Sequence, residues 1–132
     1  MYKRQPDRRR VLPAAMRMRR SSDFEATVRR GARVGRSTLV VHCRAVPDRA
    51  GAHIGMVVAR SVGGAVVRNK VRRRLRGVVV DQRAFLPDGA DVVVRALPAA
   101  GAATYHQLGE DFRSALPVAV ARSRERLSGG VR

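Results

Sequence analysis

The chain has 132 residues, with 28 Lys or Arg against 10 Asp or Glu, which gives a formal net charge of +18 at pH 7. The length favours a single domain, and the 45% hydrophobic content allows one modest core of Val, Leu and Ala, because aromatic residues make up only 4% and Trp is absent. So many positive charges repel one another in a compact state, which predicts a polyanionic partner. The single cysteine excludes an internal disulfide and a cysteine-based metal site.

Hydrophobic stretches long enough for a membrane are missing from the sequence. No run approaches the roughly 20 apolar residues of a membrane span. The basic N-terminus also lacks the apolar segment and small-residue cleavage site of a secretory signal. We therefore expect a cytoplasmic protein without a membrane partner.

Residues 1–15 show no hydrophobic period and contain two prolines and five basic residues. This composition predicts a disordered basic arm. Val11 is an alternative start of the natural product, in which case the residues before it would not belong to the protein.

The first predicted helix follows this arm. Ser22 and Glu25 have the spacing of a capping box, which marks a helix start. Phe24 and Val28 are the apolar positions of this helix, and Gly31 is its expected C-terminal stop.

Two strands are predicted next, over residues 37–44 and 53–59, and the turn residues at 47–51 predict that they pair as an antiparallel hairpin. Alternation places two sets of side chains on opposite faces of the first strand: Leu39, Val41 and Cys43 on one, and Val40, His42 and Arg44 on the other.

A strongly basic helix is predicted from Ala65 onward. Its apolar stripe has helical spacing and consists of Val67, Val71, Leu75 and Val78. The other sides carry one sign of charge and include like-charge pairs four residues apart, each of which costs about 0.2–0.5 kcal/mol in an isolated helix. These sides hold Arg68, Asn69, Lys70, Arg72, Arg73, Arg74 and Arg76. A solvated basic face is the alternative reading, but a single-signed face favours contact with nucleic-acid phosphates.

The C-terminal part predicts a strand over residues 91–96, after a turn at residues 87–89. Thr104 and Gln107 form a second capping box, which opens a last helix. Pro117 is expected to kink or break this helix, and residues 128–132 are expected to fray. The apolar positions of the last helix are Leu108, Phe112 and Leu116.

No catalytic constellation is visible in the sequence. The ten acids are scattered, and His42, His53 and His106 have no matching Cys or Asp cluster. Gly63 and Gly64 are not followed by the Lys-Ser/Thr of a triphosphate-binding loop. The pattern therefore indicates an electrostatic binder of α+β class, with helices largely on one sheet face, and it suits structured or single-stranded RNA better than DNA.

The segment from Arg60 to Arg76 resembles the protein component of bacterial ribonuclease P. The family motif has the form Gly-Asn-Ala-Val-x-Arg-Asn-Arg/Lys-x-Lys/Arg-Arg-x-x-Arg, and Gly64 stands where the family usually has Asn. The similarity extends to Arg17–Phe24 and to residues 53–59 and 92–98, and it covers about residues 16–125. The motif reads here Gly63-Gly64-Ala65-Val66-Val67-Arg68-Asn69-Lys70-Val71-Arg72-Arg73-Arg74-Leu75-Arg76.

The resemblance implies a single-domain α-β-β-β-α-β-α sandwich with a left-handed βαβ crossover, similar to the second domain of ribosomal protein S5. It adds one short strand, near residues 32–35, to the elements predicted from the pattern. The domain is expected over residues 16–127.

The resemblance also implies a function: an RNA-binding subunit that assists a catalytic RNA, with Mg²⁺ held mainly by that RNA, in removing the 5′ leader of precursor tRNA. The protein itself is expected to be monomeric and to supply no catalytic side chain. Residues expected to contact the RNA subunit are Arg68, Asn69, Lys70, Arg72, Arg73 and Arg76. Residues expected to line a cleft for the single-stranded leader are Phe24, His42, Val57, Ala59 and Arg60.

Three alternatives remain open on the sequence. A ribosomal or assembly protein that binds structured RNA would have the same composition, and so would a nucleoid-type DNA binder. Phe24 could be a core anchor rather than a leader contact. Val28 and His42 stand where the family often has aromatic residues, which weakens the expected stacking on leader bases.

Overall fold

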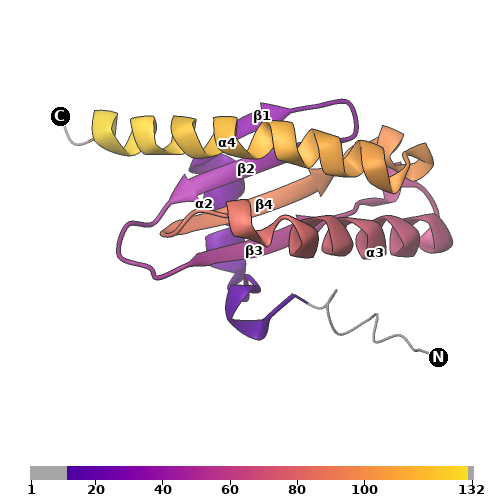
Figure 1. Ribbon diagram of the computed structural model, residues 1–132, viewed down its shortest axis with the longest axis horizontal. Coiled ribbons are helices and arrows are strands. Elements are labelled where there is room, and N and C mark those ends of the chain that lie inside the picture. The colour runs from indigo at the N-terminus through magenta and orange to yellow at the C-terminus, as the bar shows by residue number, and fades with distance from the viewer. Residues whose placement is uncertain (1–11, 131–132) are drawn as a thin grey trace.

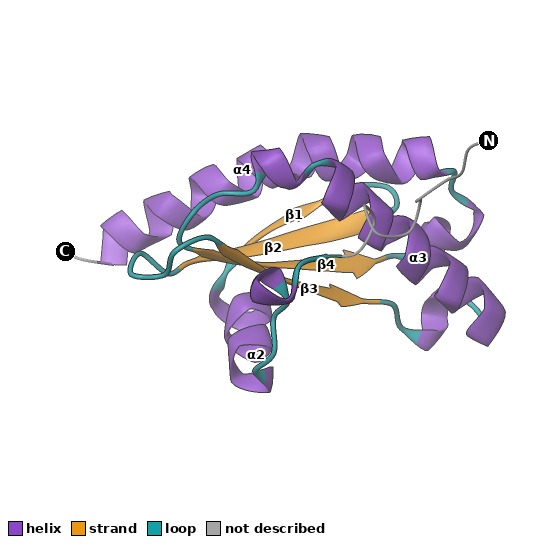
Figure 2. Ribbon diagram, turned by 60° about the horizontal axis from the view of Figure 1, so that its bottom comes forward, coloured by secondary structure: helices purple, strands orange, loops and turns teal. Residues whose placement is uncertain are grey.

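The computed structural model describes residues 12–130, and it shows a four-stranded sheet with three α-helices (Figure 1). Helices α3 and α4 lie side by side on one face of the sheet, and α2 lies on the other face (Figures 1 and 2). The predicted α-β-β-β-α-β-α order is confirmed, including the short strand near residues 32–35. In chain order the elements are α2 (Ser21–Arg30), β1 (Ala32–Gly35), β2 (Leu39–Ala45), β3 (Ala52–Val57), α3 (Ala65–Asp81), β4 (Ala90–Ala96) and α4 (Tyr105–Gly130).

The strand order in the sheet is β1-β2-β4-β3. β2 and β3 run in opposite directions, as predicted, but their direct pairing is wrong, because β4 lies between them, antiparallel to β2 and parallel to β3. β4 is buried at every position except Arg95, so it needs a neighbour on both edges. The connection between β2 and β3 is long enough to step over one intervening strand, which requires roughly 10 Å.

The unit β3–α3–β4 joins two parallel neighbouring strands through a helix. In Figure 1, with α3 in front of the sheet and β3 running to the right, the chain returns to β4 above β3, so the crossover is left-handed. About 98% of such crossovers are right-handed. The handedness expected from the family resemblance is thus present in the fold.

The main core lies between the sheet and the pair α3 and α4. As predicted, Leu39, Val41 and Cys43 of β2 face this core. Val40 and His42 point to the other face and are buried there. The predicted apolar stripes of α3 and α4 are also buried, through Val71, Leu75, Val78, Leu108, Phe112 and Leu116.

The two predicted capping boxes have different outcomes. At α4, Thr104 N–H donates to Gln107 Oε1 at 2.8 Å and Gln107 N–H donates to Thr104 Oγ1 at 3.0 Å, as a capping box requires. At α2 the prediction is wrong, since the helix begins at Ser21 with Arg20 at the cap position and no side-chain cap bond. α4 continues through Pro117 without a break, because Leu116 and Ala119 hold it in the core on both sides of the proline.

Two described segments, residues 12–15 and 128–130, fall within the expected arm and tail and have defined secondary structure or burial. Leu12 is only 3% exposed, and Ala14–Met16 forms a 3-10 helix, so the residues from 12 to 15 belong to the fold. α4 runs to Gly130, beyond residue 128, at which fraying was expected to begin. Residues 1–11, with the alternative start at Val11, and residues 131–132 lie outside the described part of the chain.

Candidate nucleic-acid interface

A sharp turn leads from β3 into the basic helix. Gly63 has a φ of 155°, and a Cβ at this position would lie 2.9 Å from the side chain of Val67, so only glycine fits without strain. Gly64 caps α3 with no side-chain bond, and the space around its missing Cβ is open. The Asn that the family usually has here would thus find room, and its side chain could accept a hydrogen bond from the first turn.

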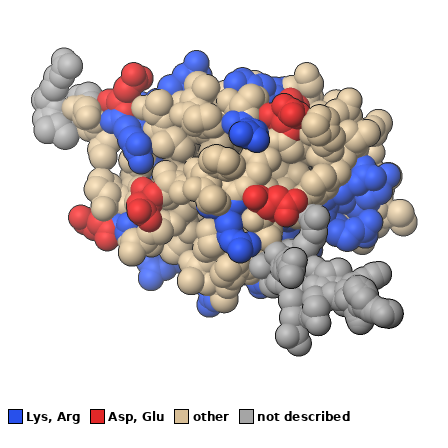
Figure 3. Space-filling model, in the orientation of Figure 1, with Lys and Arg blue, Asp and Glu red and all other residues tan. Residues whose placement is uncertain are grey.

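The basic face of α3 consists of the six residues predicted to contact RNA. Burial of Val71, Leu75 and Val78 turns the opposite side of the helix outward. In Figure 3, Lys and Arg gather at the end of the molecule where Figure 1 shows the start of α3. Three members of the basic face are exposed (Asn69, Arg73 and Arg76), and three are half-buried (Arg68, Lys70 and Arg72). The structure thus brings all six together on one surface.

Contacts within α3 distinguish its arginines. Arg72 donates to Asn69 Oδ1 at 2.9 Å, so Asn69 orients a guanidinium rather than lying free. Arg74, which we did not include among the RNA contacts, donates to the carbonyl of Ala103 at 2.7 Å and ties α3 to the segment before α4. A planar guanidinium held by one acceptor still presents further N–H groups to a phosphate.

Of the residues predicted to line a leader cleft, Phe24, His42 and Val57 lie on the α2 side of the sheet. Phe24 is half-buried, and its ring rests over Gly55 of β3, where an added Cβ would come within 3.1 Å of two ring carbons. The aromatic ring can therefore pack closely against the sheet because residue 55 is a glycine without a Cβ. Val57 ends β3 on the same face and is half-buried, whereas Ala59 and Arg60 follow it and are exposed.

His42 differs from the open position expected for it, since only 2% of the residue is exposed. Neither ring nitrogen has a hydrogen-bond partner among the described residues. Burial lowers the pKa of His42 below its usual value, and the nearby charges of Arg95 and Arg33 lower it further. His42 is thus a neutral ring in the floor beneath α2 rather than an exposed platform.

Arg95 was missed by the sequence analysis. It pairs in register with Val57 on one side and Val40 on the other, so it lies on the α2 face of the sheet, and it is half-buried. The alternation of Asp91, Val93 and Arg95 in β4 is a signal that could have found it, because every second residue of a strand shares a face.

A polar network also lies on this face, at the other end of β4. Asp91 is fully buried, and its carboxylate accepts hydrogen bonds from Arg44, at 2.7 Å, and from Arg49. The same two arginines reach Asp23 of α2, at 3.3 Å and 3.8 Å. His53 lies 3.9 Å from Asp91, and its pKa is lowered mainly by burial.

Metal-binding and membrane features are absent from the described residues. Between residues 12 and 130 no three His, Cys, Asp or Glu side chains come together to hold a metal ion. The two neighbouring acids Asp23 and Asp91 are both engaged by arginines. No helix in this part of the chain is long and apolar enough to cross a membrane.

A family model described as Ribonuclease P matches residues 12–120. The chain belongs to the ribonuclease P protein family. The match begins at Leu12, which is the first residue that the structure describes and is buried. The resemblance carried by the motif at residues 63–76 is thereby confirmed.

Relatives in the ribonuclease P family match most of the chain. A ribonuclease P protein component from Streptomyces avermitilis is 48% identical over 132 residues, covering 91% of this chain and 98% of that protein. One from Acidothermus cellulolyticus is 52% identical over 103 residues, covering 77% of this chain and 86% of that protein.

Solved structures show the same fold. The ribonuclease P protein from Thermotoga maritima has a TM-score of 0.67 at 25% identity, covering 76% of this chain and 94% of that one. A Staphylococcus aureus ribonuclease P protein mutant, described as defective in mRNA degradation activity, has a TM-score of 0.71 at 26% identity, covering 80% of this chain and 88% of that one.

Proposed function

We propose that this chain is the protein subunit of a ribonucleoprotein endoribonuclease that removes the 5′ leader from precursor tRNA. The observation that carries the proposal is the family motif, displayed on one single-signed face of α3, while Val57 and Phe24 lie on the opposite side of the sheet. The protein acts in the cytoplasm as a monomer on one RNA subunit. Its part is to bind and position RNA, and the RNA subunit supplies the catalysis.

The basic face of α3 binds the RNA subunit. Its five cations have no acid among them, so their repulsion is relieved when phosphates replace water at this surface. Arginine suits a phosphate contact because its planar fork donates two parallel hydrogen bonds. Asn69 contributes by fixing the direction of Arg72.

The leader lies against the other side of the sheet, beside α2. Phe24 offers a ring for stacking on a base, and Val57 and Ala59 offer apolar contact. Arg60 is exposed, and Arg95 is half-buried on the same face, so both can meet leader phosphates. His42 supports this surface from beneath.

Magnesium chemistry is assigned to the RNA subunit in this proposal. The described side chains offer no group of oxygen ligands of the kind that Mg²⁺ prefers, so the residues do not fit a protein-held metal. In this proposal the described residues bind and position RNA, and no step of theirs passes through the ion.

Co-purification tests the proposal against its alternatives. The chain is isolated at low salt, and the bound nucleic acid is sequenced. Recovery of one abundant structured RNA related to ribonuclease P is the expected result. Recovery of ribosomal RNA would favour the assembly-protein alternative, and recovery of DNA would favour a nucleoid binder.

Reconstitution tests the division of labour. The nuclease-treated protein alone should leave precursor tRNA and mRNA intact. Addition of the recovered RNA with Mg²⁺ should restore cleavage at the 5′ end of the mature tRNA sequence. Processing by the protein without RNA would contradict the proposal.

A further inference from the structure

Helix α2 carries Phe24, yet it has little apolar anchorage of its own. Within α2, all of which the structure describes, Thr27 alone is buried. The hydroxyl of Thr27 makes its hydrogen bond within α2, to the carbonyl of Asp23 at 2.7 Å. A helix usually gains its stability by packing an apolar face, so something else must fix α2 over the sheet.

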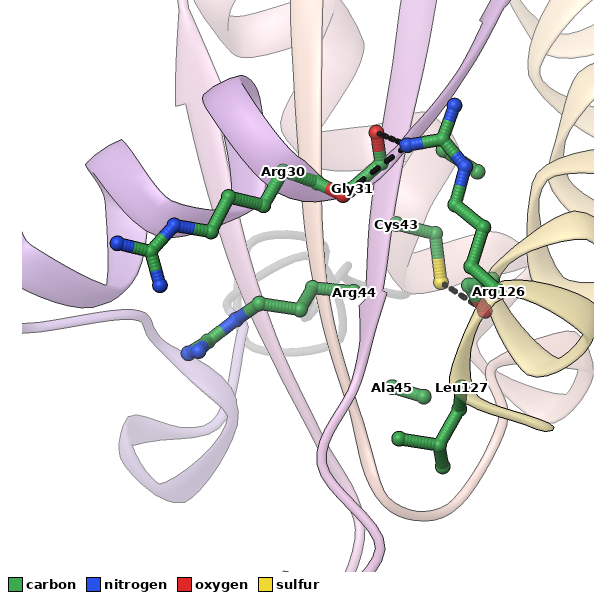
Figure 4. A pocket seen from close by; sticks show the side chains of 9 residues that line it. Arg30, Gly31, Cys43, Arg44, Ala45, Arg126 and Leu127 are labelled. Carbon is green, nitrogen blue, oxygen red and sulfur yellow. Dashed lines mark hydrogen bonds between the residues drawn. The ribbon is translucent and has the colours of Figure 1, made fainter. Parts of the chain in front are cut away.

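Arginines from other elements hold α2 at both ends. At the C-terminal end, Arg126 of α4 donates to the carbonyls of Arg30 and Gly31 at 3.0 and 2.9 Å (Figure 4). At the N-terminal end, Arg44 of β2 bridges Asp23 of α2 to the buried Asp91 of β4. These polar contacts tie the helix to strands and to α4, in addition to the half-buried apolar contact that Phe24 makes with β3.

The N-terminal tie is built around Asp91. Its carboxylate accepts from both Arg44 and Arg49, which fixes the direction in which each guanidinium reaches. Each arginine then has a second contact, to a different oxygen of Asp23. Asp23 immediately precedes Phe24, so the network fixes the turn of α2 that holds the aromatic ring.

Stability alone is a weak reason for such a network. Taking charges out of water costs several kcal/mol per ion, and well-packed apolar residues often serve stability as well or better. A carboxylate that accepts several hydrogen bonds fixes the positions of the groups that donate them. Here the carboxylates fix the distance between α2 and Gly55 of β3. The ring of Phe24 packs against Gly55.

We propose that Asp23 and Asp91 are positioning residues for leader recognition. Through Arg44 and Arg49 they set the spacing between α2 and the sheet, and this spacing determines whether Phe24 meets a leader base. The inference rests on the proposed function, because it assigns these residues to the leader surface and not to the RNA-subunit surface. Neither aspartate touches RNA in this role.

Asp23→Asn is the decisive variant. Asp23 is partly exposed, so the change removes the link to α2 while the pairs of Asp91 with both arginines remain. Glu25→Gln is the matched control, because Glu25 lies two residues away on the same helix, is exposed, carries the same charge, and makes no side-chain hydrogen bond or ion pair with the described residues. Both variants are assembled into holoenzyme with the RNA subunit.

The measurement is the ratio of affinities for precursor tRNA and for mature tRNA. Loss of a partly exposed ion pair should lower this ratio about fivefold for Asp23→Asn, with binding of mature tRNA unchanged relative to Glu25→Gln. Hydrogen exchange of the amides of α2 should become faster in Asp23→Asn, with α4 unaffected. A merely structural role would weaken both tRNA forms equally.

The outcomes separate the inference from the proposed function. If the wild-type holoenzyme does not prefer precursor over mature tRNA, the leader surface itself is wrong. If it does prefer the precursor, but Asp23→Asn matches Glu25→Gln in the ratio and in exchange, the positioning role is overturned. Asp91→Asn serves as a second variant where it folds, and it should lower the ratio at least as far as Asp23→Asn.

Discussion

Asn69 and His42 each have a role in this fold that their helix propensity or polarity alone would not predict. Asn69 is a poor residue for the interior of a helix, but its side chain accepts a hydrogen bond from Arg72. His42 is a polar ring in a buried place, with no partner for its nitrogens among the described residues. In both cases the neighbours, and not the residue type, determine the role.

His42 should make stability depend on pH. Its pKa is lowered in the folded protein, so the unfolded chain takes up a proton first as the pH falls below about 6.5, and stability is lost there. His42→Phe should reduce this loss and should stabilise the protein by about 1 kcal/mol, because a buried polar group without a partner is removed. Urea unfolding at about pH 7.5 and about pH 5.5 measures both effects.

His106→Gln is the control for this experiment, since His106 is exposed. The difference between the two pH values in this variant gives the background with which His42→Phe is compared. An equal pH dependence in wild type and His42→Phe would contradict the role given to His42.

Phe24 should separate leader binding from folding. Phe24→Ala removes a ring that could stack on a base, which is worth about 1–3 kcal/mol, so precursor tRNA should bind more weakly and mature tRNA should be little affected. A buried Phe truncated to Ala costs about 3–5 kcal/mol of stability, but Phe24 is half-buried and should cost less. Thermal melts and the two tRNA affinities together show whether Phe24 contacts the leader or anchors the core. A large loss of stability with equal weakening of both tRNA forms would identify Phe24 as a core anchor.

At the scale of elements, α3 combines two independent surfaces. Its inner side is held by Val71, Leu75 and Val78, while Arg73 and Arg76 on its outer side are exposed and make no hydrogen bond or ion pair with other residues in the described part of the chain. The helix can therefore lose outer cations without losing its packing. This separation makes the basic face testable without disturbing the fold.

Arg73→Ala combined with Arg76→Ala should weaken assembly with the RNA subunit. The isolated fold should be unchanged or slightly more stable, because helix propensity rises and like-charge repulsion falls. The slope of the logarithm of affinity against the logarithm of salt concentration should become shallower by about two. Arg122→Ala with Arg124→Ala on α4 is the control of equal charge, and a similar loss there would argue against a specific role for α3.

Local patterns predicted the elements well and their pairing poorly. The capping box at Thr104 and the stripe of α3 depend on neighbours three or four residues away, so the sequence displays them directly. The insertion of β4 between β2 and β3 depends on residues far apart in the chain, since His42 pairs with Val93 across the sheet. The contacts of Asp91 with Arg44 and Arg49 are non-local in the same way, and no spacing in the sequence predicts them.

At the scale of the whole molecule, the net charge of +18 should dominate association with RNA. Each phosphate that is neutralised contributes about −0.7 to −0.9 to the salt slope, so six contacts should cost about a thousandfold in affinity between about 50 and about 200 mM salt. Filter binding or fluorescence anisotropy over this range measures the slope. An affinity independent of salt would show that phosphate contacts do not carry the binding.

The place of β4 in the sheet has a consequence for how the protein is made. A ribosome adds roughly 5–20 residues per second, so about one to three seconds separate the end of α3, at Asp81, from the end of β4, at Ala96. During that interval β3 has been synthesised, but its neighbouring strand has not. Each nascent chain therefore passes through a stage in which the basic helix has already been translated while the middle of the sheet is missing.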